Sequence, residues 1–269
     1  MGDFDFSSAP GEAFVTLRGG GVGFNSARRF TCDAPARLRR RLSNELAAPG
    51  AAEAFVEAIE PLFSSYETLN AALLPFSFSL EPMLGMPGTT GAEGSLIKVL
   101  LRVEPLQTPL LAHLVERLNE LAAEAGQEEG VSCDLSGDVP RLLLREIRWL
   151  EHLVDPSNLT EKLLQVLDAA VAPLALQREI VGFIPEVVCI EDEAIVAERL
   201  ASLIEVNDDL LVSALEALTQ LTLPAQLQEQ ISEDSINRLE STDPKNVPVI
   251  LRFLLTAGCH SGGGGGGAR

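Results

Sequence analysis

The sequence predicts an all-α fold in which antiparallel helix pairs stack side by side. Its 269 residues are 46% hydrophobic, which is enough for a sizeable core. The apolar residues are mainly Leu and Ala, with 11 Phe but only one Trp and one Tyr, a composition typical of packed helices. In addition, an apolar stripe recurs at a nearly fixed interval in the second half of the chain, which indicates repeated helical units.

Three predicted helices carry matching apolar stripes, and each is the second helix of a pair. The stripes recur at intervals of 35 and then 36 residues. The spacing i, i+4, i+7 within each stripe places the side chains on one face of a helix. The matched sets are Leu176, Ile180 and Phe183; Leu211, Leu215 and Leu218; and Val247, Leu251 and Leu254.

The first helices of these pairs are expected to begin near Leu159, Glu193 and Ala225. A single helix pair of this size cannot bury its apolar face, so neighbouring pairs must stack. The sequence therefore predicts an α-solenoid of the HEAT or armadillo kind over residues 14–258, without a sheet. Residues 1–13 and the Gly-rich segment 259–269 are expected to be flexible tails.

The helix predicted over residues 174–188 contains a proline, Pro185. Proline cannot donate to the carbonyl of Val181, and inside a helix it costs about 3 kcal/mol unless other contacts hold the turn. We expect neighbouring repeats to clamp the helix so that it passes through Pro185 with a kink. The alternative is that the helix ends at Ile184.

Composition excludes several classes of protein. The chain has 39 acidic and 20 basic residues and a net charge of −19, which repels nucleic acid and anionic membranes and favours basic partners. No apolar run reaches the length of a membrane span, and the first residues lack the features of a signal peptide. The four cysteines are far apart, so we expect neither disulfides nor a zinc module, in an intracellular protein.

No catalytic pattern is visible. The Gly-rich segment 18–26, RGGGVGFNS, lacks the Gly-Lys-Ser/Thr ending of a phosphate-binding loop, so we expect a flexible loop there. His113, His152 and His260 are not accompanied by a nucleophile and an orienting carboxylate. We therefore expect no enzymatic activity, no cofactor and no bound metal.

Two segments differ sharply in charge. Residues 27–42 are rich in arginine and contain one acid, so Arg37, Arg39, Arg40 and Arg41 are candidates for contacting nucleic-acid phosphates. The alternative is a solvated helix face, because no aromatic residues interleave for base stacking. Residues 186–209 are instead acidic, which fits either simple solvation or a surface that receives a basic segment.

A run of motifs over residues 139–188 resembles the N-terminal helical region of the Fanconi anaemia complementation group D2 family. The resemblance continues more loosely to residues 246–255 and backwards to Phe14. The matching positions are Pro140, Trp149-Leu150, Val154-Asp155, Leu159-Thr160, Ala172-Pro173, Leu176-Gln177 and Ile184-Pro185-Glu186.

This resemblance implies a nuclear scaffold of DNA interstrand-crosslink repair. Members of the family pair with a group I paralogue, are monoubiquitinated on a lysine and close on duplex DNA as a clamp. Lys98, Lys162 and Lys245 do not match the modified lysine, which would lie outside this segment. Duplex DNA would be bound only by the full-length clamp.

The resemblance also implies a ubiquitin-binding segment, with Pro173 as its proline and Leu203 and Ile204 as its paired aliphatic residues. The same residues are equally explained as solenoid core. Two functions therefore stay open: a non-enzymatic part of a D2-type repair clamp, or an unrelated acidic HEAT-type adaptor that binds basic peptides.

Overall fold

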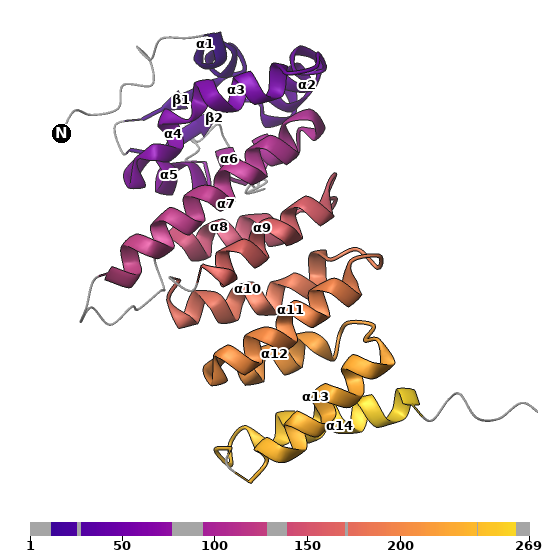
Figure 1. The fold of residues 1–269 in the computed structure, drawn as a ribbon. Coiled ribbons are helices and arrows are strands. Elements are labelled where there is room, and N and C mark those ends of the chain that lie inside the picture. Colours follow the sequence, from indigo (N-terminus) through magenta and orange to yellow (C-terminus); the bar gives the residue numbers. More distant parts are fainter. Residues whose placement is uncertain are drawn as a thin grey trace, which may run out of the picture. The chain divides into compact units, whose positions relative to one another are not determined.

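The computed structural model describes residues 12–25, 28–76, 94–127, 139–169, 172–240 and 242–261. The chain forms two compact units, Met1–Asp155 and Pro156–Arg269. The boundary between them falls inside residues 14–258, which were expected to form one solenoid. The described residues form fourteen α-helices, a short 3₁₀ helix and one two-stranded sheet, so the fold class is all-α (Figure 1). Both predicted tails lie almost entirely outside the described residues, since α1 begins at Glu12 and α14 ends at Ser261.

The first unit is organised around one long helix, α7, which packs against α3, α4, α6 and α8. Its apolar face includes Leu106, Leu110 and Leu114, which are fully buried. The elements in chain order are α1 (Glu12–Gly19), β1 (Val22–Phe24), β2 (Phe30–Cys32), α2 (Pro35–Glu45), α3 (Ala51–Ile59), α4 (Pro61–Ser64), α5 (Tyr66–Leu73), α6 (Leu96–Leu101), α7 (Glu104–Gln127) and α8 (Val139–Arg148).

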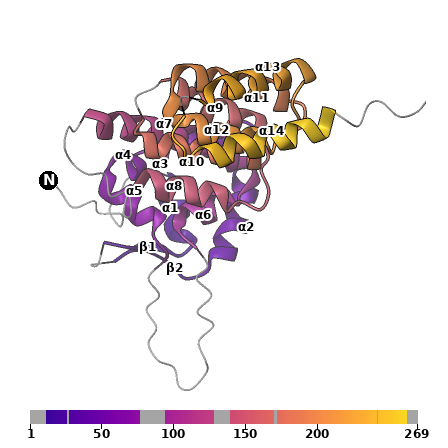
Figure 2. The ribbon, with the colours of Figure 1, turned by 90° about the horizontal axis from the view of Figure 1, so that it is seen from below.

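The prediction that the chain has no sheet is wrong, because β1 and β2 form an antiparallel hairpin that pairs Val22 with Cys32 and Phe24 with Phe30. Most of the Gly-rich segment expected to be a flexible loop is therefore the end of α1 and strand β1. Gly21, at φ 89°, turns the chain out of α1. Burial of Val22, Phe30 and Cys32 then holds the hairpin, with β1 packed on α1 (Figure 2).

The second unit is a stack of helix pairs. Within it, α10 packs on α9 and α12, α12 packs on α11 and α14, and α14 packs on α13. Figure 2 shows the first helices of the pairs in one layer and the second helices in another. The elements are α9 (Pro156–Asp168), α10 (Leu174–Val187), α11 (Glu193–Val206), the 3₁₀ helix η2 (Asp208–Leu210), α12 (Leu211–Leu218), α13 (Ala225–Arg238) and α14 (Val247–Ser261).

Two of the three predicted stripes are buried as expected, but the third was placed one residue out of register. In α14, Leu251 is 45% exposed, whereas Ile250 and Phe253 are buried. These two residues follow Leu215 and Leu218 by 35 residues, so the interval is the same throughout. Because α14 carries apolar residues on several faces, its sequence fits two registers, and the packed structure selects the one that buries the large Phe253 ring.

Helix α10 passes through Pro185 and ends at Val187, so the alternative that it stops at Ile184 is wrong. Val181, whose carbonyl loses its helical partner, is fully buried, as is Ile184. The amide of Val188 donates to the carbonyl of Ile184 at 3.0 Å and closes the last turn. Packing of α10 between α9 and α12 holds the helix across the missing bond.

The register makes a direct prediction about stability. Leu215→Ala should lower the free energy of unfolding by about 2 to 4 kcal/mol, because the fully buried side chain leaves a cavity in the packing of α12. The matched control, Leu251→Ala, removes a half-exposed side chain and should cost less than about 0.5 kcal/mol. Urea unfolding of the two variants measures the difference, and equal losses would contradict the register.

Candidate interaction sites

Helix α2 presents the predicted arginine cluster. Leu38 and Leu42 are fully buried and fix the inner face of the helix. Helical geometry then places Arg37, Arg40 and Arg41 along one outward face and Arg39 on the other flank. Arg37, Arg39 and Arg40 are exposed, and Arg41 is half-buried.

Some arginines of α2 and of the segment just before it already have partners within the chain. The Nε atom of Arg41 donates to Glu45 Oε1 at 2.7 Å, and its guanidinium packs against Gly19. Arg28 Nη1 similarly pairs with Glu67 at 2.9 Å.

Among the described residues, no carboxylate pairs with Arg37, Arg39 or Arg40. These three cations are therefore placed to contact phosphates or carboxylates. The neighbouring aromatic Phe30 is buried and packs edge-on to Phe24, so it offers no exposed ring for base stacking.

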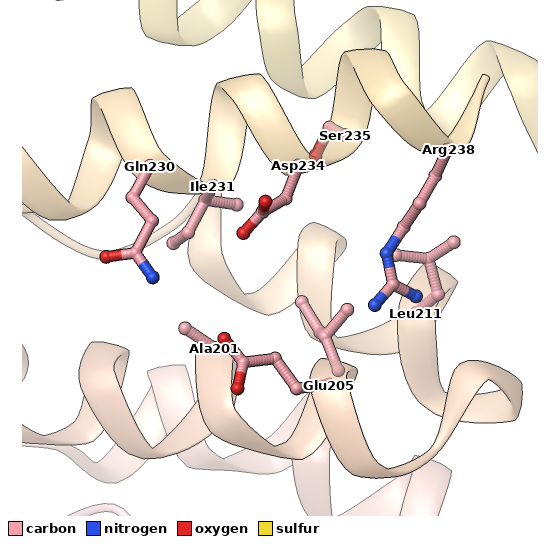
Figure 3. A pocket seen from close by; sticks show the side chains of 9 residues that line it. Ala201, Glu205, Leu211, Gln230, Ile231, Asp234, Ser235 and Arg238 are labelled. Atoms are coloured by element: carbon pink, nitrogen blue, oxygen red, sulfur yellow. The ribbon is translucent and has the colours of Figure 1, made fainter.

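The residues predicted to bind ubiquitin lie on two different helices. Pro173 directly precedes α10 and is half-buried, whereas Leu203 and Ile204 belong to the last turn of α11. Ile204 is buried and lines a cavity of about 20 Å³. Leu211 and Ile231 of the following helices line the same cavity (Figure 3). Leu203 is half-buried. Ubiquitin binding by these residues stays a prediction.

A groove of about 610 Å³ lies in the second unit, and the sequence patterns did not predict it. It is lined by residues of α10, η2, α12, α13 and the turn before α14. The 35-residue interval could have revealed it, because Asp208 and Asp243 occupy equivalent positions of consecutive repeats at its edge.

Two of the three cations in this groove are paired with acids, and the third donates to a backbone carbonyl. Arg178 Nη2 donates to the backbone carbonyl of Asp209 at 3.1 Å, and Arg238 pairs with Asp208. Lys245 Nζ lies 2.8 Å from Asp243. Their hydrogen bond lowers the pKa of the Asp243 carboxyl and raises the pKa of Lys245. Three cations therefore face three acids, and the groove has no excess charge with which to select a ligand.

Polar contacts also link successive helix pairs elsewhere in the second unit. Arg199 of α11 pairs with Asp168 of α9. Ser157 Oγ donates to Asp192 at 2.5 Å, and the amide of Thr222 donates to Glu193 at 2.8 Å. Several acids of the segment 186–209 are thus already bonded within the chain.

His113 and His152 make contacts that are typical of structural residues. His113 lies against Phe63, with ring centroids 5.7 Å apart. His152 is exposed, and its carbonyl accepts from Gln107 Nε2 at 2.9 Å. Within the described ranges, no three His, Cys, Asp or Glu side chains are grouped so that they could hold a metal ion. None of the helices described is both long and apolar enough to cross a membrane.

The fold makes this an all-α protein whose second unit is built from stacked helix pairs. A family model described as "Fanconi anaemia protein FancD2 nuclease" matches residues 31–262, which covers most of both units. The chain belongs to the FancD2 family. The resemblance seen over residues 139–188 is thereby confirmed and extends over most of the chain.

Three vertebrate relatives support the same assignment. The chain is 28% identical over 221 residues to the Fanconi anemia group D2 protein homolog of Rattus norvegicus, and equally so to that of Mus musculus. It is 27% identical over 219 residues to the Fanconi anemia group D2 protein of Gallus gallus. These matches cover 81% of the chain but only 14 to 15% of each relative.

The arginine cluster predicts weak, salt-sensitive binding of duplex DNA by this chain alone. A net charge of −19 opposes binding, and the cluster on α2 contributes only a few arginines to one surface, so few phosphates can be neutralised. We expect a slope of log affinity against log salt of magnitude about 3 to 5. Fluorescence anisotropy of a labelled duplex between about 50 and 200 mM salt measures it.

Changing Arg37, Arg39, Arg40 and Arg41 together to Glu should abolish that binding. For single changes, Arg40→Glu should weaken it, whereas Arg252→Glu, on an exposed position of α14, supplies the control of equal charge change. Tight binding that survives both the salt and the fourfold change would contradict the charge argument.

Proposed function

We propose that the chain is a non-enzymatic scaffold segment of a D2-type protein, acting in DNA interstrand-crosslink repair in the nucleus. In this proposal it forms part of a DNA clamp that pairs with the group I paralogue. Monoubiquitination regulates the clamp on a lysine outside these 269 residues. The observation that carries the proposal is the family match over residues 31–262, which runs through both compact units.

The surface charges support the proposal that DNA is bound mainly by the rest of the clamp and not by this segment. An isolated chain with 39 acids and 20 bases repels DNA over most of its surface. Only three arginines of α2 lack a described carboxylate partner in the predicted phosphate-contacting cluster. We therefore assign tight binding of duplex DNA to the full-length clamp. This segment contributes part of the clamp's structure and a surface that contacts the partner.

Pairing with the group I paralogue is tested by a pull-down with both purified proteins. The tagged chain should retain the paralogue, and so should the full-length D2-type protein that contains it. If neither retains it, the pairing is wrong. If the chain instead retains an Arg-rich peptide and releases it at high salt, the acidic adaptor is the better description, because its surface carries the required negative charge.

The absence of catalysis needs its own test, because the family description contains the word nuclease. The chain should leave end-labelled single-stranded and duplex DNA intact in the presence of Mg²⁺ or Mn²⁺, since its described residues show no arrangement of nucleophile, base and orienting group. Cleavage that co-purifies with the protein and is abolished by a point substitution would overturn this part of the proposal.

A further inference from the structure

Helix α8 turns three arginines outward. Arg141, Arg145 and Arg148 are exposed and follow the spacing i, i+4, i+7, which lines one side of a helix. Its one carboxylate, Glu146, points inward, where it is buried and accepts a hydrogen bond from Ser95 Oγ at 3.2 Å. In a chain of net charge −19, the outer surface of this helix therefore stands out as cationic.

The chain's single tryptophan follows this helix directly. The side chain of Trp149 is 64% exposed, although Trp is among the side chains that gain most from burial. Lys98 of α6 lies over the ring, with Nζ 5.7 Å from its centroid. The stem of Lys98 in turn packs against Gly94, so the cation is held near the ring by its own packing.

A buried glutamine holds the loop that carries this tryptophan. Gln107 Nε2 donates to the carbonyls of Leu101, at 3.0 Å, and of His152, at 2.9 Å. Its Oε1 atom accepts from the amide of Val154 at 2.6 Å. These three bonds tie the segment after α8 to α6 and α7. The exposed ring is thus presented by a fixed backbone, which lowers the entropy cost of docking a partner on it.

We propose that Trp149, Arg145 and Lys98 form a docking surface for an acidic segment of a partner protein, with an apolar side chain of that segment packed on Trp149. Charge complementarity selects the occupant, because Lys98 lies over the exposed ring and the exposed Arg145 precedes Trp149 by one helical turn. Trp and Arg are also the side chains that most often dominate protein interfaces.

Stabilisation of α8 by its own charges explains only some of the residues on this surface. Arg145 and Arg148 lie in the last turn of α8, where cations interact favourably with the helix dipole. The dipole explains neither Arg141, in the first turn, nor the exposure of Trp149. Duplex DNA is the less favoured occupant. A long polyanion is repelled by the negative charge of the whole chain, whereas a short acidic peptide is repelled by fewer of its charges.

The test uses the intrinsic fluorescence of Trp149, which reports this surface alone because the chain has no other tryptophan. The probe is a short labelled peptide rich in Asp and Glu with one central leucine. Its addition should shift Trp149 emission to shorter wavelength in a saturable manner, as the ring leaves water, and should raise the peptide's anisotropy.

Charge-matched variants separate this surface from general electrostatics. Arg145→Glu should weaken peptide binding about five- to tenfold, while Arg252→Glu, an equal charge change on exposed α14, should leave it unchanged. Trp149→Ala should abolish the anisotropy change. Circular dichroism melts of each variant check that the fold is intact.

Several results would overturn the proposal. These are no binding of the peptide by the parent chain, no effect of Arg145→Glu, or equal binding of a peptide whose leucine is replaced by serine. Single-stranded or duplex DNA that displaces the peptide and loses affinity on Arg145→Glu would make the surface a nucleic-acid site and would equally reject the acidic protein partner.

Discussion

Burial of each second helix against its own first helix and against neighbouring second helices is the constraint on which the second unit depends. Helix α12 shows it best, because it contacts α10, α11 and α14 together. Leu215 and Leu218 are fully buried in this position. No pair can satisfy its apolar stripe alone, so the length of the repeat, its polar turns and the position of each helix all follow from stacking. Stacking also explains why α10 tolerates Pro185, because packing against α9 and α12 stabilises the turn that has lost its backbone hydrogen bond.

Periodicity in the sequence was sufficient to predict the helix pairs of the second unit. Helices α11 and α13 begin at Glu193 and Ala225, the residues near which they were expected. Periodicity gave a wrong prediction where a helix fits two registers or where an element is too short to show a repeat. The surplus of apolar residues in α14 permitted a register that wrongly buries Leu251, and three-residue strands such as β1 are too short to show an alternation.

The interaction sites were predictable only where they are local in sequence. The arginines of α2 form one cluster because they are adjacent along one helix. Trp149 was visible as a motif position, but its exposure and its contact with Lys98 depend on residues about fifty positions apart. The groove of the second unit is likewise assembled from several repeats, with Arg178 and Asn246 at its two extremes in sequence. Such sites require the tertiary packing to be known.

The two units handle their charges differently. In the described residues, the first unit carries several exposed arginines on α2 and α8, while Arg199, Arg238 and Lys245 of the second unit are paired with acids. The polar links of the second unit join each helix pair to its neighbour at the solvent edge, as between Arg199 and Asp168, both about half exposed. Exposed ion pairs cost little to break and re-form. Cohesion between successive pairs therefore comes mainly from buried apolar residues such as Leu215 and Leu218, and the ion pairs at the solvent edge add little to it.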